Sequence, residues 1–332
     1  MLIPDPPSPR PRFRTVFMGT GEIGLPSLKL LLARSDCDVV GVVTQPDKPA
    51  GRSRALKGSI IKEVGATHGL PVFQPVSLRK PDSLETLQTW NPDLIVVMAF
   101  GQILPKSVLD LPRIACLNLH ASLLPKYRGA SPIHAAIAAG ENETGISVMF
   151  MAEGLDTGDV LLMQRERIRR RDTAGSLHDR LSAVAAHALS QAIDQLSAGA
   201  AQRVPQDDTA ASYAGRLTRA DAMIDWSLPT RQIERQIRAM NPWPVAWTTI
   251  QLADGTRRDL KVFSAISCRE SAGDPGRILR ADDRGTLIAA GEGAILIRQV
   301  QMEGRKRMTA GEWQLGTPLL ASGVAGGTGT TP

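Results

Sequence analysis

The chain has few cysteines, and none is spaced for a shared task. Cys37, Cys116 and Cys268 lie far apart, with no C-x-x-C pair among them. This spacing argues against a zinc site and against a disulfide framework. We therefore expect a reduced, cytoplasmic protein without a bound metal.

Long apolar runs are missing as well. No segment approaches the roughly 18 consecutive apolar residues of a membrane span. Residues 1–12, MLIPDPPSPRPR, contain no apolar core or cleavage pattern of a signal peptide. We expect no membrane partner, and we expect disordered tails at residues 1–12 and 318–332.

The remaining composition is that of an ordinary globular protein. The 332 residues are 42% hydrophobic and 22% charged, and this length favours two domains. The formal charge of +6 and the isoelectric point near 9.5 favour a polyanionic partner, although only modestly.

Short apolar runs alternate with helical patterns through the first half of the chain. FRTVFMG, DVVGVVTQ, DLIVVMAF and IACLNLH read as strands, with PSLKLLLAR, SIIKEVGATHG and LETLQTW as helices between them. Near-continuous Val, Ile and Leu runs are typical of strands buried on both faces of a parallel sheet. The pattern predicts a Rossmann-like, doubly wound parallel sheet over residues 13–199.

A second domain is expected after a polar linker at residues 200–216. Residues 217–317 contain one helical segment, TRQIERQIRAM, and about five short strand candidates separated by Gly, Asp and Pro turns. This pattern predicts a small OB-like β-barrel.

The first strand is followed by GTGEIG, which matches the dinucleotide fingerprint G-x-G-x-x-G. The acidic residue expected at the end of the next strand is missing, because that strand ends VVTQP. The glycines are therefore better explained by a tight turn and close helix packing than by a bound nicotinamide nucleotide.

Two segments of the chain are rich in basic residues. Residues 45–62 contain one acidic residue, Asp47, and five basic residues: Lys48, Arg52, Arg54, Lys57 and Lys62. This segment could wrap a phosphate backbone, or it could be a solvated loop without a partner. The run RERIRRR at 165–171 looks like an edge strand leading into a turn, where solvation is the better explanation.

The strand IACLNLH ends with Asn118 and His120, which alternation places on the same side. Carboxyl ends of parallel strands are where ligands bind. An amide N–H and an imidazole aimed at one point suit a carbonyl oxygen that becomes negative during acyl transfer.

A carboxylate would complete this pair, and the loop AEGLDTGDV supplies Asp156, with Asp159 as a competitor. Either acid could instead be a turn residue that bonds its own backbone. The other histidines have no partner at metal or triad spacing: His68, His134, His178 and His187.

The segment from NLHASLLPKYRG to LDTGDV resembles the core of the folate-dependent formyltransferases, since the Asn-x-His pair, the SLLPxYRG-type loop and LDTGD recur in that order. TQPDKPAGR, MIDWS and MNPWPVAW further resemble the members of that family that act on tRNA. The similarity extends from about residue 13 to residue 317.

The resemblance implies transfer of a formyl group from 10-formyltetrahydrofolate to the α-amino group of methionine on initiator tRNA. We expect a monomer, because two domains that embrace one tRNA require no symmetry. It implies catalytic roles for Asn118, His120 and Asp156. It places the folate donor on Ser122, Leu123, Leu124 and Pro125, and the tRNA on Lys48, Arg52, Arg54 and Lys57. A formyltransferase for a nucleotide sugar or another small amine is the alternative, and an NAD-dependent dehydrogenase and a non-catalytic RNA-binding protein are rivals of other classes.

Overall fold

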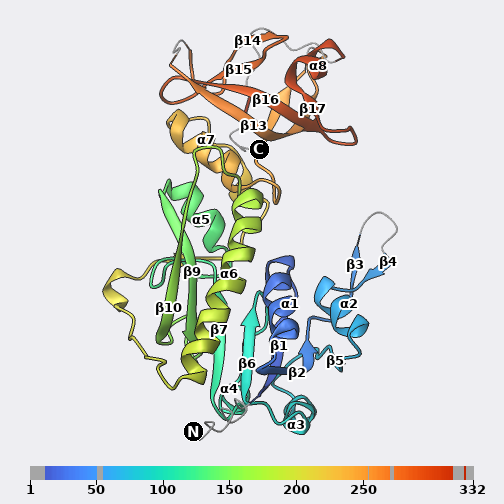
Figure 1. The fold of residues 1–332 in the computed structure, drawn as a ribbon. Helices are drawn as coiled ribbons and strands as arrows, with labels where there is room; N and C mark the ends of the chain where they lie inside the picture. Colours follow the sequence, from blue (N-terminus) through green and yellow to red (C-terminus); the bar gives the residue numbers. More distant parts are fainter. Residues whose placement is uncertain (1–11, 51–54, 253, 270–272, 317–324, 327–332) are drawn as a thin grey trace, which may run out of the picture. The chain divides into compact units, whose positions relative to one another are not determined.

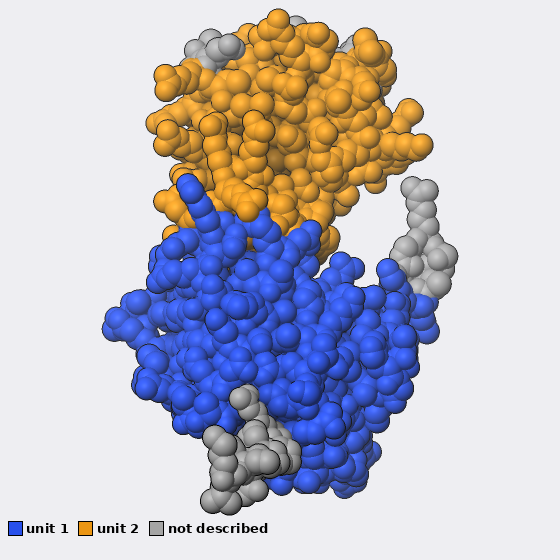
Figure 2. Space-filling view, in the orientation of Figure 1, with its two compact units in different colours: residues 1–129, 143–167, 178–213 blue, residues 130–142, 168–177, 214–332 orange. Residues whose placement is uncertain are grey.

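The computed structural model describes residues 12–50, 55–252, 254–269, 273–316 and 325–326. The chain divides into two compact units (Figure 2), one made of residues 1–129, 143–167 and 178–213 and the other of residues 130–142, 168–177 and 214–332. Among the described residues, no helix is both long enough and apolar enough to cross a membrane.

A seven-stranded sheet forms the core of the first unit (Figure 1), with the strand order β10-β9-β7-β6-β1-β2-β5. β1, β2, β5, β6 and β7 run parallel, as expected. The bounds are β1 Phe13–Gly19, β2 Cys37–Val43, β5 Val72–Phe73, β6 Leu94–Met98, β7 Ala115–His120, β9 Glu143–Phe150 and β10 Val160–Arg167.

β9 and β10 depart from the parallel pattern. β9 pairs antiparallel with β7, and β10 pairs antiparallel with β9 at the edge of the sheet. Seven of the eight residues of β9 are buried, as in a strand at the centre of a parallel sheet. The sequence pattern of β9 therefore did not reveal its direction. The second half of RERIRRR follows this edge strand, as predicted.

The helices follow the predicted alternation with the strands. α1 packs on β2, and α2 packs on β2 and β5. α6 buries Leu177, Leu181, Ala185 and Leu189. These residues are four apart, so they form one apolar stripe along the buried side of the helix. The helices from the first half of the chain are α1 Leu25–Ala33, α2 Ile60–Thr67, α3 Pro81–Thr89, α4 Lys106–Leu109, α5 Pro132–Ala139 and α6 Ala174–Ser197.

The glycines of GTGEIG serve packing. A Cβ on Gly19 would lie 2.7 Å from the Phe17 ring and 3.0 Å from the Met98 carbonyl oxygen, so the turn into α1 closes only with glycine there. Gln45, which follows β2, donates its side-chain amide to the Phe100 carbonyl. These contacts fit the packing interpretation of the motif.

The second unit contains a curled antiparallel sheet of order β12-β13-β16-β15-β14, with β17 on β16. Its core includes Trp226, Ile237, Ile250, Val262 and Ile297. The Rossmann-like sheet followed by a small antiparallel β-barrel domain is thus confirmed. The bounds are α7 Thr230–Ala239, β12 Trp247–Gln251, β13 Arg257–Cys268, β14 Ile278–Asp282, β15 Gly285–Ala289, β16 Ala294–Met302, β17 Met308–Thr309 and α8 Ala310–Leu315.

Two local details differ from the sequence-based expectation. Ser131 stands at the N-cap of α5 but makes no side-chain capping bond, whereas Gly140 ends this helix in the left-handed conformation, as expected. Ala325 is buried in the core of the second unit, and its backbone N–H donates to the Gly276 carbonyl. This position was expected to lie in a disordered tail. Most of the two expected tails lies outside the described residues.

The thiols give a test of this packing. Burial raises the pKa of Cys37 to about 11 and the pKa of Cys116 to about 12. At pH 8 roughly 0.1% of Cys37 and 0.01% of Cys116 would be thiolate, the reactive form. In the native protein we expect iodoacetamide to modify only Cys268 promptly, and urea to expose the other two thiols. Fast labelling of the native Cys268→Ser variant would contradict the fold.

Candidate active site at the end of strand β7

Asn118 and His120 lie on one face of β7, as alternation requires. The intervening Leu119 and the preceding Leu117 are buried on the opposite face, 3% and 0% exposed. β7 lies between β6 and β9, so both edges of its backbone are paired. This pairing makes β7 rigid, so the two polar side chains have a fixed base at its carboxyl end.

Asp156 joins this pair from the loop that follows β9. Its Oδ1 accepts from Asn118 Nδ2 at 3.3 Å, and its Oδ2 lies 3.5 Å from His120 Nδ1. The backbone N–H of Gly129 donates to the same Oδ2 at 2.8 Å. The structure therefore gathers the three residues that the sequence singled out, and it selects Asp156 over Asp159 as the acid beside them.

Both ring nitrogens of His120 face a partner. Nε2 lies 2.9 Å from the backbone carbonyl of Tyr127, which can only accept, so Nε2 carries a hydrogen in this arrangement. Tyr127 has a φ of 59°, the left-handed region that side chains other than glycine rarely adopt. That turn aims its carbonyl at the imidazole. Nδ1 is consequently the nitrogen that faces Asp156.

The loop after β7 is fixed by one serine of β9. Ser147 Oγ donates to the Ser122 carbonyl at 2.7 Å and accepts from Leu124 N at 3.0 Å. Ser122 Oγ donates to the Lys126 carbonyl at 2.6 Å, which closes the loop on itself. Ser122 and Leu124 are buried, whereas Leu123 and Pro125 are partly exposed.

Asp156 is held in a strained backbone conformation. Its φ of 52° costs on the order of 1 kcal/mol for a residue with a side chain. Two residues later, a Cβ on Gly158 would lie 1.8 Å from the Phe150 carbonyl oxygen, so the loop folds back tightly on the end of β9. This close return directs the Asp156 carboxylate toward Asn118.

The predicted basic segment forms a small hairpin separate in sequence from these residues. β3 Lys48–Ala50 pairs antiparallel with β4 Ala55–Lys57, and Lys48 lies directly opposite Lys57. Both lysines are exposed. Arg52 and Arg54 lie outside the described residues. Lys62 forms an ion pair with Asp47 at 2.6 Å, so its charge is already matched within the protein.

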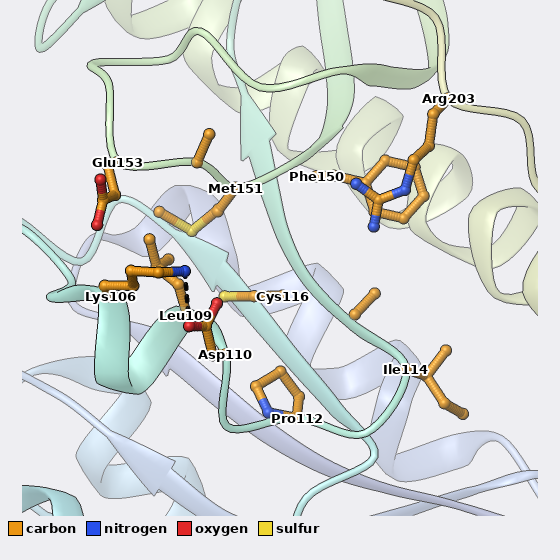
Figure 3. Close-up of a pocket in the computed structure, with 12 residues that line it drawn as sticks. Lys106, Leu109, Asp110, Pro112, Ile114, Cys116, Phe150, Met151, Glu153 and Arg203 are labelled. Atoms are coloured by element: carbon orange, nitrogen blue, oxygen red, sulfur yellow. Dashed lines mark hydrogen bonds and ion pairs between the residues drawn. The ribbon is translucent and has the colours of Figure 1, made fainter.

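A cavity of about 440 Å³ opens near the beginning of β7 and is lined by residues that include Lys106, Cys116 and Glu153 (Figure 3). The guanidinium of Arg203 lies over the Phe150 ring at 3.9 Å. None of the three site residues lines this cavity. Over the part of the chain that the structure describes, no three His, Cys, Asp or Glu side chains gather as a metal site would require.

Sequence reasoning missed several groups that shape this site. The Tyr127 carbonyl and the Gly129 N–H belong to the backbone, and no side-chain pattern announces them. Ser147 lies in β9, where seven of the eight residues are buried, and a polar side chain within that strand was the available signal, although Thr144 gives the same signal.

Two family models match the chain. The formyl transferase model covers residues 14–193, and the formyl transferase C-terminal domain model covers residues 216–318. The chain therefore belongs to the formyl transferase family. Several relatives place it more narrowly.

The methionyl-tRNA formyltransferase of Methylacidiphilum infernorum is 45% identical over 314 residues, covering 94% of this chain and 98% of the relative. That of Pseudomonas fluorescens is 46% identical over 295 residues, covering 89% and 91%. Within the family, the chain thus belongs with the methionyl-tRNA formyltransferases.

Solved structures share the fold at lower identity. The sugar 3N-formyltransferase WlaRD aligns with a TM-score of 0.62 at 17% identity, covering 90% of this chain and all of that one. HypX from Aquifex aeolicus, solved with tetrahydrofolic acid, aligns with a TM-score of 0.60 at 17% identity over 91% of this chain. The chain spans 47% of the length of HypX.

Ser147 gives a direct test of how the loop is held. Ser147→Ala leaves the Ser122 carbonyl and the Leu124 N–H without their partner in a buried place, so the free energy of unfolding should fall by about 1–3 kcal/mol. Urea denaturation measures this change. Ser107→Ala, at an exposed position of α4, is the control and should leave the midpoint unchanged. Equal midpoints for both variants would contradict the bridging role of Ser147.

Proposed function

We propose that the chain transfers the formyl group of 10-formyltetrahydrofolate to the α-amino group of methionine on initiator tRNA, with Asn118, His120 and Asp156 performing the chemistry. Formylation of methionyl-tRNA is the activity of the methionyl-tRNA formyltransferases, the group within the family to which the chain belongs. The observation that supports the residue roles is the Asp156 carboxylate, 3.3 Å from the Asn118 amide and 3.5 Å from the His120 ring. We further propose that the enzyme is a cytoplasmic monomer.

The reaction is direct acyl transfer between two nitrogens. The methionine amine attacks the formyl carbon, a C–N bond forms, and the carbonyl oxygen becomes an oxyanion. The bond from that carbon to the donor nitrogen then breaks. The attacking amine loses one proton and the departing nitrogen gains one, so the site must stabilise an oxyanion and move a proton.

Asn118 is the donor best suited to the oxyanion. One N–H of its amide faces Asp156, and an amide carries two. The second N–H can point at the formyl oxygen while the first keeps the side chain fixed. A preorganised donor of this kind contributes roughly 3–4 kcal/mol to transition-state stabilisation.

Asp156 and His120 form the route for the proton. The Tyr127 carbonyl fixes the ring of His120 with Nδ1 toward the carboxylate. A proton taken from the amine can therefore pass between the carboxylate and Nδ1 without a large movement of either group. Asn118 and the Gly129 N–H hold the carboxylate while this occurs.

Position in the chain supports the folate-binding role. Ser122, Leu123, Leu124 and Pro125 begin two residues after His120, so a folate donor held there would lie beside the reacting groups. The hairpin presents Lys48 and Lys57 across from each other, and like charges in that register repel. A phosphate of the tRNA backbone relieves this repulsion, which favours the hairpin as a contact for tRNA.

Replacing Asn118 tests the oxyanion role. For Asn118→Ala we expect kcat to fall about 100- to 1000-fold, with little change in KM for either substrate, because the lost bond forms in the transition state. Steady-state assays of formyl-methionyl-tRNA formation measure both constants. Asn142→Ala, at an exposed site, is the matched control. An effect confined to KM would rule out the proposed role.

The hairpin lysines should affect tRNA alone. For the double variant Lys48→Ala and Lys57→Ala we expect weaker tRNA binding, and a slope of log affinity against log salt that is shallower by roughly 1 to 2 units. The KM for the folate donor should stay constant. The control pair Lys29→Ala and Lys80→Ala removes two exposed lysines elsewhere. If both pairs weaken tRNA binding equally, net charge rather than the hairpin is responsible.

The acceptor is identified most simply by direct competition. The protein is incubated with 10-formyltetrahydrofolate and either methionyl-initiator tRNA or a nucleotide-linked amino sugar, and the products are analysed by mass spectrometry. We expect formylation of the aminoacyl group only. Formylation of the sugar, with the tRNA unchanged, would favour the alternative function.

A further inference from the structure

A single side-chain amide from outside both site loops holds the backbone of Asp156. Gln206 Nε2 donates to the Asp156 carbonyl at 2.8 Å and to the Gly158 carbonyl at 2.7 Å. Capturing two carbonyls two residues apart fixes the intervening backbone. The left-handed conformation of Asp156 lies within the segment that is fixed in this way.

The opposite end of the same amide is held by a buried arginine. Gln206 Oε1 accepts from Arg128 Nε at 3.1 Å and from Arg128 Nη2 at 2.8 Å. Arg128 is 2% exposed, and its Nη2 also donates to Asp208 at 2.7 Å. Every hydrogen-bonding site of the Gln206 amide is therefore used, and its orientation is determined by partners on both sides.

Arg128 also connects this amide to the second loop of the site. Its backbone N–H donates to the Ser212 carbonyl at 2.8 Å, and Ser212 Oγ accepts from the Tyr127 N–H at 2.9 Å. Gly129, the next residue, donates its N–H to the Asp156 carboxylate. Residues 206–212 thus contact the loop that supplies Asp156 and the loop that orients His120.

From this geometry we propose that Gln206, supported by Arg128, is a positioning residue that fixes the Asp156 carboxylate against Asn118 and His120. The inference rests on the proposed function, because Asp156 is the acid of the reaction there. Only a side chain with both a donor and an acceptor group at its end satisfies two carbonyls and a guanidinium at once. Glutamate at this position would keep the contacts to Arg128 but present an anion to the two carbonyls.

The test compares Gln206→Glu with the wild-type protein. We expect kcat to fall at least 10-fold, with KM for tRNA and for the folate donor within about twofold, because Asp156 touches the reacting atoms but Gln206 does not. Gln191→Glu, at an exposed position of α6, makes the same charge change and should match the wild type. Gln206→Met, similar in length and uncharged, should show the same loss of kcat if the glutamate variant fails to fold.

A second measurement does not depend on catalysis. The Gly129 N–H is protected by its bond to the Asp156 carboxylate, so its hydrogen exchange should accelerate in Gln206→Glu or Gln206→Met and stay constant in Gln191→Glu. Unchanged exchange at Gly129, or a kcat within twofold of wild type, would overturn the proposal. If the wild-type protein forms no formyl-methionyl-tRNA, the proposed function fails, and the exchange at Gly129 still decides whether Gln206 positions Asp156.

Discussion

One carboxylate joins the separate segments of this site. Asp156 contacts Asn118 and His120 on β7, and it accepts the N–H of Gly129 from the loop that follows. Only 12% of the Asp156 side chain is accessible, so protein donors rather than water satisfy most of this carboxylate. Each contact that is lost would leave it less constrained beside Asn118 and His120. The order of the strands, the tight return at Gly158 and the buried serine of β9 all serve to bring these donors to one place.

The parallel sheet explains why the site lies where it does. β7 is paired on both sides, which gives Asn118 and His120 a rigid base at its carboxyl end, and the antiparallel return of β9 places Ser147 opposite His120. The glycine-rich turn after β1 plays a different part, because Gly19 lets the chain pass close to Phe17 and Met98. The proposed catalytic residues therefore lie at a different strand end from the one that carries the dinucleotide-like motif.

Much of this arrangement could be predicted from the sequence, since it follows from local periodicity. Alternation placed Asn118 and His120 on one face, and the Gly-flanked turn indicated Asp156. The contribution of Gln206 could not be predicted, because it lies 50 residues from Asp156 in a polar stretch that looks like a linker. Arg128 lies in the loop NLHASLLPKYRG, and no sequence pattern indicated that its guanidinium is buried. The antiparallel direction of β9 escaped prediction because burial on both faces gives the same composition in either direction.

We propose that Asn118 and Asp156 act as one unit around the formyl carbonyl, and a double-mutant cycle measures whether they are coupled. Single-turnover formyl transfer is measured for Asn118→Ala, Asp156→Asn and the double variant, with the substrates saturating. If the two residues act together, the double variant should be about as slow as the slower single variant, because the second change has little left to remove. Losses that multiply would show that the two residues act independently and would rule out a shared role.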